Sequence, residues 1–231
     1  MRSADPRCTL AGILVMLVCG CAQAPGAPDR PWPNTPAGDG APAKADPAAA
    51  KTDPGALARV DETSVPAPVL GSYEAALQLM RENQLEAAEK ALGALIVQRP
   101  ELGGPHANLG IVLRRTDRMD KAVAELETAV KCNPRQPVFW NQLGITYRLQ
   151  GQIGKAREAY EHAIEIDPGY PSPILNLGIL FDLYLWDSKR ALELYDRYLA
   201  LTPGGDPKVT KWIADLNHRG REQAAQRKEQ E

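Results

Sequence analysis

The residues best suited to chemistry in this 231-residue chain are four cysteines and three histidines. Cys19 and Cys21 lie close together at the end of an apolar run, residues 8–20. Two thiols at this spacing could bind a metal ion, form a disulfide or be modified covalently. A metal site would need two further ligands, and the next cysteine or histidine along the chain is His106. The spacing therefore does not favour a metal site.

The other candidates for catalysis are Cys132 and the histidines His106, His162 and His218. No histidine is paired with another histidine or a cysteine at helical spacing, and the patterns HExxH and GxSxG are absent from the sequence. We expect His106 to be a packed residue and Cys132 to be a buried, small apolar residue. We therefore predict no catalytic site, no metal site and no cofactor. An enzyme that uses Cys132 is the alternative.

The composition divides the chain into two parts. Ten of the prolines lie between residues 22 and 68, whereas every tyrosine and both phenylalanines follow residue 72. Charge is nearly balanced, with 27 basic and 29 acidic side chains. A nucleic-acid-binding protein is expected to carry an excess of basic residues, so we do not expect nucleic acid as a partner.

The first part begins like a secretory signal peptide. Arg2 and Arg7 precede the apolar run of residues 8–20, and small residues follow it. The run is shorter than the roughly 20 residues that a membrane-spanning helix needs. We therefore expect a cleaved signal and no permanent membrane span.

The end of the apolar run, VCGC at residues 18–21, resembles the lipobox of bacterial lipoproteins. The resemblance implies that residues 1–20 are a lipoprotein signal peptide and that Cys21 is lipidated. Its acyl chains would anchor the mature chain to a membrane of the bacterial cell envelope. Ala22, and not aspartate, follows the cysteine, which in that family points to the outer membrane and to a location facing the periplasm.

Residues 21–66 are rich in alanine and proline, with scattered charges. They contain too little apolar side chain to offset the entropy of ordering the chain. We expect a disordered, semi-extended linker between the anchor and a folded domain.

The second part of the chain repeats itself with a fixed period of about 34 residues. The recurring residues are Leu109, Leu143 and Leu177, each followed by glycine; Pro100, Pro134 and Pro168; and Ala88, Ala122 and Ala156. A fixed period of this length is typical of a solenoid built from pairs of helices.

Residues 137–170 show what the repeat does. Trp140, Leu143 and Tyr147 share one face of a first helix, because gaps of three and four residues return to the same side. Small residues stand where two antiparallel helices must approach closely. The pattern resembles the tetratricopeptide repeat at all eight of its characteristic positions.

The resemblance implies an all-α fold, a right-handed solenoid of about four repeats. The expected ranges are 69–102, 103–136, 137–170 and 171–205 within a domain at 69–205, followed by a capping helix and polar tail at 206–231. End units of solenoids need such a cap on their last hydrophobic face.

In tetratricopeptide proteins the first helices of the repeats line a concave surface that binds a segment of a partner protein. Carried over by position, the expected partner-binding residues are Tyr73, Arg81, Asn108, Ile111, Arg114, Arg115, Asn141, Ile145, Arg148, Asn176, Ile179 and Asp182. The four arginines among them should form a positive stripe, which favours a partner segment that contains carboxylates.

The sequence therefore predicts a non-enzymatic adaptor or scaffold that is anchored in the bacterial envelope by lipid. Its partners would be protein segments and, through the lipid, a membrane. A narrower alternative is an assembly factor of a type IV pilus, a secretion system or a TonB-type system, although pilus assembly lipoproteins of this kind have about six repeats. A self-assembling structural subunit is a further alternative.

Overall fold

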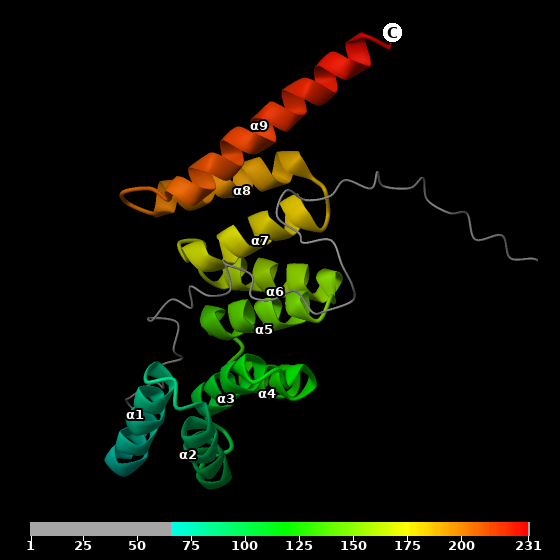
Figure 1. Ribbon diagram of the computed structural model, residues 1–231. Coiled ribbons are helices and arrows are strands. Elements are labelled where there is room, and N and C mark those ends of the chain that lie inside the picture. Colours follow the sequence, from blue (N-terminus) through cyan, green and yellow to red (C-terminus); the bar gives the residue numbers. More distant parts are fainter. Residues whose placement is uncertain (1–65, 231) are drawn as a thin grey trace, which may run out of the picture. The chain divides into compact units, whose positions relative to one another are not determined.

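The structure is a computed structural model that describes residues 66–230, which form nine α-helices and no strand (Figure 1). The helices are α1 (Ala67–Arg81), α2 (Leu85–Gln98), α3 (Gly103–Arg115), α4 (Met119–Cys132), α5 (Pro137–Leu149), α6 (Ile153–Ile166), α7 (Pro171–Leu183), α8 (Ser188–Leu201) and α9 (Pro207–Lys228). The expected all-α architecture is confirmed. The predicted signal peptide, Cys21 and most of the predicted linker lie outside the described residues.

The helices pack as consecutive pairs. α1 contacts α2, α3 contacts α4, α5 contacts α6 and α7 contacts α8, and the second helix of each pair contacts the first helix of the next pair. The odd-numbered helices also contact one another along the stack, from α1 through α3 and α5 to α7. The structure is therefore the expected solenoid, in which the odd-numbered helices form an inner layer.

Proline and a left-handed residue mark the ends of the helices. Proline stands in the first turn of α1, α5, α7 and α9, where its missing N–H costs no helical hydrogen bond. The turn inside each pair contains one residue with positive φ: Asn83 at 62°, Asp117 at 61°, Gly151 at 75° and Trp186 at 57°. The first three are each separated by one repeat period, and Trp186 comes one position late, because the α7–α8 turn is longer.

The two helices of a pair approach most closely at the glycine of the Leu-Gly pattern. A Cβ atom on Gly144 of α5 would lie 2.6 Å from Tyr160 Cε1 of α6. The equivalent atom on Gly178 of α7 would lie 2.8 Å from Tyr195 Cε1 of α8. No side chain larger than hydrogen fits at these positions without moving an aromatic ring, which explains why the glycine recurs in every repeat but the first.

The last helix covers the end of the stack. α9 buries Val209 and Leu216, and its Trp212 ring lies 5.7 Å from the ring of Tyr195 on α8, measured between centroids. After Leu216 the helix continues to Lys228 with mostly exposed side chains, and Figure 1 shows this half extending beyond α8. Within residues 66–230, no helix combines the length and the apolar character that crossing a bilayer requires.

We predict that Gly144→Ala is less stable than Gly154→Ala by about 1–3 kcal/mol, the usual cost of overpacking a core. Both changes replace a helical glycine with alanine, but only the first places a methyl group against Tyr160, since nothing beyond the neighbouring residues and backbone of its own helix lies within 4 Å of a Cβ on Gly154. Urea unfolding of the two variants measures the difference. Equal midpoints would show that the helix pair can relax around the methyl group.

Candidate functional site

The predicted partner-binding residues all lie on the inner helices. α1 carries Tyr73 and Arg81; α3 carries Asn108, Ile111, Arg114 and Arg115; α5 carries Asn141, Ile145 and Arg148; and α7 carries Asn176, Ile179 and Asp182. Arg81 and Arg115 are exposed, and the other ten side chains are buried in the full chain. The role of these residues in binding a partner stays a prediction.

Amide side chains link neighbouring inner helices. Asn108 Nδ2 donates to the Tyr73 hydroxyl at 2.5 Å, from α3 to α1. Asn176 Nδ2 donates to Asn141 Oδ1 at 2.9 Å, from α7 to α5. In the part of the chain that the structure describes, Asn108 Oδ1 is buried and accepts no hydrogen bond. An unsatisfied buried acceptor costs about 1–3 kcal/mol, so this oxygen is a place where a donor from another molecule would be stabilising.

Arg114 is a buried cation of the inner layer. Its Nη1 donates to the carbonyl oxygen of Gln142 at 3.2 Å and to Thr146 Oγ1 at 3.0 Å, and its Nη2 donates to Gln142 Oε1 at 2.7 Å. Burial lowers the pKa of Arg114 to about 10, and the nearby charges of Arg148 and Arg115 contribute to that shift. Arg114 therefore remains protonated at neutral pH.

The other arginines of the inner layer also donate to neutral acceptors. Arg115 reaches back to α1, where it donates to the carbonyl oxygen of Met80 at 3.3 Å, and to Asn83 Oδ1 at 2.7 Å. Arg148 Nε donates to the Tyr160 hydroxyl at 3.4 Å, and Arg81 donates to Gln78 on its own helix. The bonds of Arg115 and Arg81 involve no carboxylate and therefore do not neutralise the charge of these two side chains.

Asp182 lies where the inner layer meets the last helix. Its carboxylate accepts from the Tyr195 hydroxyl at 3.3 Å and from Arg219 Nη2 of α9 at 3.2 Å. Burial raises the pKa of Asp182 above its ordinary value of 3.8, against the opposing effect of Arg219 and Tyr195. Asp182 was expected to contact a partner, whereas the structure shows that it also fixes α9. Sequence reasoning missed Arg219, because nothing in the polar tail distinguishes it from neighbouring basic residues.

The structure changes the interpretation of Cys132. The expectation of a buried thiol is wrong: α4 buries Ala129 and Val130, but Cys132 is the last residue of the helix and is exposed. Its Sγ lies 3.8 Å from the carbonyl oxygen of Pro100. The same carbonyl oxygen lies 3.1 Å from His106 Nε2.

His106 is a packed residue, as expected. Its Nδ1 lies 2.7 Å from Glu125 Oε2, so both ring nitrogens have partners and neither is bound to the Cys132 thiol. Among residues 66–230, no group of three or more histidine, cysteine and acidic side chains could hold a metal ion. This arrangement gives Cys132 no base to activate it.

A second concave feature lies between α2 and α4. This hollow of about 400 Å³ is lined by Leu109 and Leu113 of α3, and by carboxylates from both flanking helices, Glu89 and Glu125. Glu125 is the partner of His106. Whether the hollow offers a carboxylate that is not already paired therefore depends on the contacts of Glu89.

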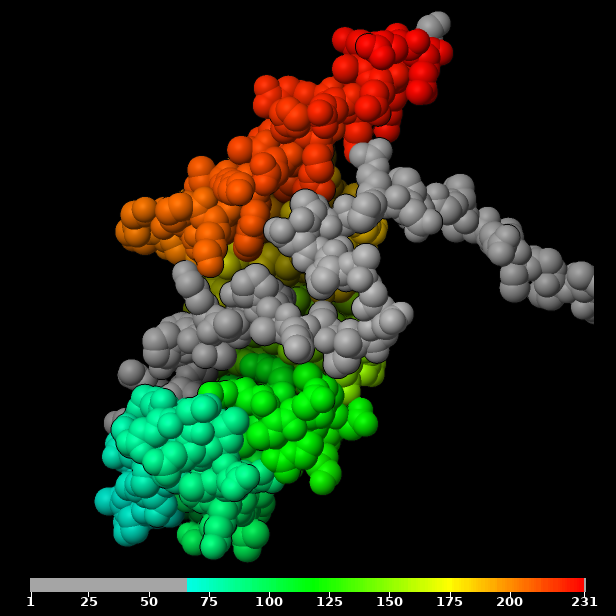
Figure 2. Space-filling model, in the orientation of Figure 1, coloured from blue at the N-terminus to red at the C-terminus, as the bar shows by residue number. Residues whose placement is uncertain are grey.

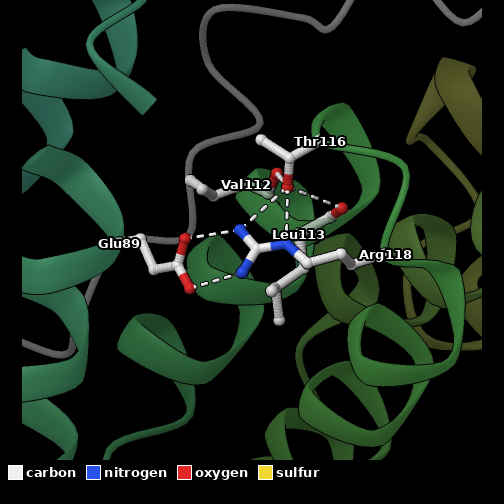
Figure 3. Close-up of polar contacts among 5 residues, drawn as sticks. All are labelled: Glu89, Val112, Leu113, Thr116 and Arg118. Atoms are coloured by element: carbon white, nitrogen blue, oxygen red, sulfur yellow. Dashed lines mark hydrogen bonds and ion pairs between the residues drawn. The ribbon is translucent and has the colours of Figure 1, made fainter. Parts of the chain in front are cut away.

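Glu89 forms an ion pair with Arg118 (Figure 3). Arg118 Nη1 donates to Glu89 Oε1 at 2.7 Å, while Nη2 donates to Oε2, and this pairing lowers the pKa of Glu89. Arg118 Nε also donates to Thr116 Oγ1 at 3.0 Å, and that hydroxyl lies 3.1 Å from the carbonyl oxygens of Val112 and Leu113. The pair ties α2 to the start of α4, so both carboxylates of the hollow serve internal contacts.

Comparison with known proteins identifies the repeats. Residues 137–170 and residues 73–137 each match a family described as the tetratricopeptide repeat. α7 and α8 continue the same stack beyond the matched residues. Residues 73–170 therefore consist of tetratricopeptide repeats, and the fold of the described residues is a solenoid of such helix pairs. No curated protein matches the sequence.

Several solved structures have a similar fold. PilF from Pseudomonas aeruginosa is 23% identical over 69% of this chain and 72% of its own, with a TM-score of 0.62. MamA from Desulfovibrio magneticus RS-1 is 22% identical over 58% of this chain and 75% of its own, with a TM-score of 0.52. YrrB, described as a TPR protein with an unusual peptide-binding site, is 21% identical over 66% of this chain and 74% of its own, with a TM-score of 0.53. At these identities the likeness shows the fold alone.

We predict that the stability of the protein, relative to Asp182→Asn, falls as the pH rises from about 4 towards neutral. Because the pKa of Asp182 is raised in the folded state above its ordinary value of 3.8, the folded state binds this proton more tightly than the unfolded chain. The buried carboxylate is therefore tolerated best when it is neutral, as the amide always is. At neutral pH Asp182→Asn should be at least as stable as the native chain.

Urea unfolding at several pH values measures this difference. Arg219→Met removes the cation that opposes the shift, so its loss of stability should be larger at pH 7 than at pH 4. A native chain that gains stability over Asp182→Asn as the pH rises would contradict the prediction.

Proposed function

We propose that this protein is a non-enzymatic adaptor that is held at a membrane of the bacterial envelope by lipid on Cys21 and binds a segment of a partner protein along its inner helices. The tetratricopeptide fold supports the coarser part of this proposal, a scaffold for protein–protein interaction. The peptide-binding site in the description of YrrB agrees with a peptide as the kind of ligand.

The observation that carries the proposal is the buried, unsatisfied oxygen of Asn108. An extended peptide presents one backbone N–H donor per residue, and a single such donor would satisfy this acceptor. Gln142 and Asn176 occupy the same position in the next two repeats, so the inner layer offers a row of amides. Because Asn108 is buried in the full chain, binding requires exposure of this face, and the apparent affinity falls with the fraction of exposed molecules.

The charge of the inner layer defines the preferred partner. Arg114 and Arg115 donate to neutral acceptors, and Arg114 lies close enough to Arg148 for their charges to interact. A segment with carboxylates would neutralise this charge and gain charge-assisted hydrogen bonds. We therefore propose an acidic segment of a partner protein as the ligand.

The membrane location depends on residues outside the described part of the chain. The lipobox-like sequence at residues 18–21 supports acylation of Cys21, and the linker at 21–66 gives the repeats reach from the membrane. A single acyl chain binds a membrane only marginally, so a lipoprotein needs more than one chain on this cysteine. We propose the outer membrane, with the repeats facing the periplasm.

Two other candidates remain open to test. An assembly factor of a type IV pilus, a secretion system or a TonB-type system is a narrower form of the adaptor, and the similarity to PilF supports only the shared scaffold. A self-assembling subunit would bind a second copy of the chain at the same face. An enzyme is disfavoured, because the exposed Cys132 lacks a base in this structure.

We predict that Cys21→Ser abolishes incorporation of labelled palmitate and that the protein is then washed from membranes by alkaline carbonate. Cys19→Ser is the matched control, because it removes a neighbouring thiol and keeps Cys21. It should be labelled like the native chain. Labelling of the Cys21→Ser chain would show that the anchor is elsewhere or absent.

We predict that a photo-crosslinking residue at Arg81 or Leu175, on the inner helices α1 and α7, captures one and the same partner in the native cells. The same residue at Lys131 or Glu161, which are exposed on α4 and α6, should not capture it. Arg81→Glu should lower the yield from Leu175 roughly fivefold, about 1 kcal/mol, while Lys131→Glu leaves it unchanged. Equal capture from the inner and outer helices would contradict binding along the inner layer. Capture of a second copy of the chain would indicate self-assembly.

A further inference from the structure

The turn between α7 and α8 differs from the other turns inside the helix pairs. It exposes three consecutive apolar residues, with Tyr184 at 42%, Leu185 at 38% and Trp186 at 62%. The equivalent turns contain only polar residues and glycine: Glu82 to Gln84, Thr116 to Arg118, and Gln150 to Gln152. Three consecutive apolar residues with this much exposed surface mark a contact with another molecule.

The backbone conformation of this turn also indicates a contact with another molecule. Trp186 has φ of 57°, in the left-handed region, where a bulky side chain is unfavourable. Asn83, Asp117 and Gly151 hold the same place in the other turns, and these three residue types tolerate that conformation. A tryptophan that is both unfavourable for its backbone and exposed to solvent is a candidate for function.

The turn is firmly held by its backbone. The N–H groups of Tyr184 and Leu185 both donate to the carbonyl oxygen of Leu180 at 3.1 Å, and the Asp187 N–H donates to that of Phe181 at 2.9 Å. Asp187 Oδ1 accepts from the Arg190 N–H at 3.1 Å and caps α8. The three apolar side chains are therefore presented on a fixed tip.

The chemistry of the tip fits a lipid bilayer better than a protein. Three side chains of this size, all partly covered, present at most a few hundred Å², whereas each partner of a specific protein interface contributes at least about 500 Å². Tyrosine and tryptophan combine an apolar ring with a polar edge and favour the interface between lipid and water. Two residues separate Trp186 from the exposed Lys189 and Arg190. Arg190 Nε lies 3.4 Å from Asp187 Oδ2, so Lys189 is the cation that the tip offers to anionic headgroups.

We propose that the α7–α8 turn is an interfacial membrane contact, in which Tyr184, Leu185 and Trp186 insert at the headgroup level of an anionic bilayer. The turn lies at the edge of the stack where α5 also turns into α6 (Figure 1), and not on the inner layer. Membrane contact at this edge leaves the inner helices free to bind a partner. The inference rests on the proposed membrane location for its biological role, but not on the partner or on the lipid itself.

The test uses the chain from residue 21 onward with Cys21→Ser, so that neither the apolar run at residues 8–20 nor acylation contributes, and vesicles of phosphatidylcholine with or without phosphatidylglycerol. We expect binding to the anionic vesicles, measured by co-sedimentation. Trp186→Asn should weaken it roughly tenfold, the order expected for removing one large apolar side chain from lipid. Lys189→Glu should weaken it at least roughly fivefold, since one basic residue near an anionic surface contributes about that factor.

Two controls distinguish a contact made by this turn from a general effect of exposed apolar residues and from a loss of stability. Val97→Ser removes an apolar side chain that is 84% exposed on α2, away from the turn, and should leave vesicle binding unchanged. Trp186→Asn gives the turn the residue type that Asn83 provides in the first repeat, so the fold should keep its urea midpoint. Quenching of tryptophan fluorescence by brominated lipid should be strong in the parent and weaker in Trp186→Asn.

The possible outcomes are distinct. Absence of binding to anionic vesicles, or equal binding by the parent and Trp186→Asn, would overturn the membrane contact. Loss of partner crosslinking from Leu175 in Trp186→Asn, with vesicle binding unchanged, would also overturn it and identify a protein contact instead. Failure of Cys21 acylation would remove the proposed anchor and leave the vesicle result as it stands.

Discussion

The close approach of the two helices in each repeat determines the rest of the structure. At Gly144 and Gly178 the backbone of an inner helix lies against a tyrosine ring of its partner, with no room for a methyl group. Because each pair contacts only its neighbours, this spacing is set locally and then propagated along the stack. In Figure 2 these successive pairs appear as bands of colour from α1 at one end of the described stack to α9 at the other.

Besides the binding role that we propose for it, the inner layer uses its polar side chains to connect neighbouring repeats. Asn108, Arg114 and Asn176 were singled out as binding residues, and each makes a hydrogen bond to the preceding or following inner helix. Such bonds fix the register between repeats, which the apolar contacts between helices define less strictly. What is left for a partner is the unused capacity of these groups, above all the second acceptor of Asn108 and the charge of the arginines.

The fixed repeat period was sufficient to predict the helix pairs, because it reflects contacts within one pair and between neighbours. The exposure of Cys132 could not be predicted from that pattern, since the residue lies at a helix end, where the alternation of buried and exposed faces stops. The burial of the binding candidates and the bond from Arg219 to Asp182 depend on side-chain contacts between distant residues. The left-handed backbone of Trp186 likewise appears only in the structure.

The fourth repeat contains two features that distinguish this chain from a uniform stack of repeats. Its turn carries the exposed tip, and its inner helix holds Asp182, to which α9 is bound through Arg219. A helix that covers the end of a solenoid would need only apolar contacts to do so. The additional bond from α9 to the inner layer costs the burial of a carboxylate, because the pKa of Asp182 is raised and not lowered by its surroundings. The stack therefore closes with a contact that connects its last helix to the inner layer, the same layer that we propose binds a partner.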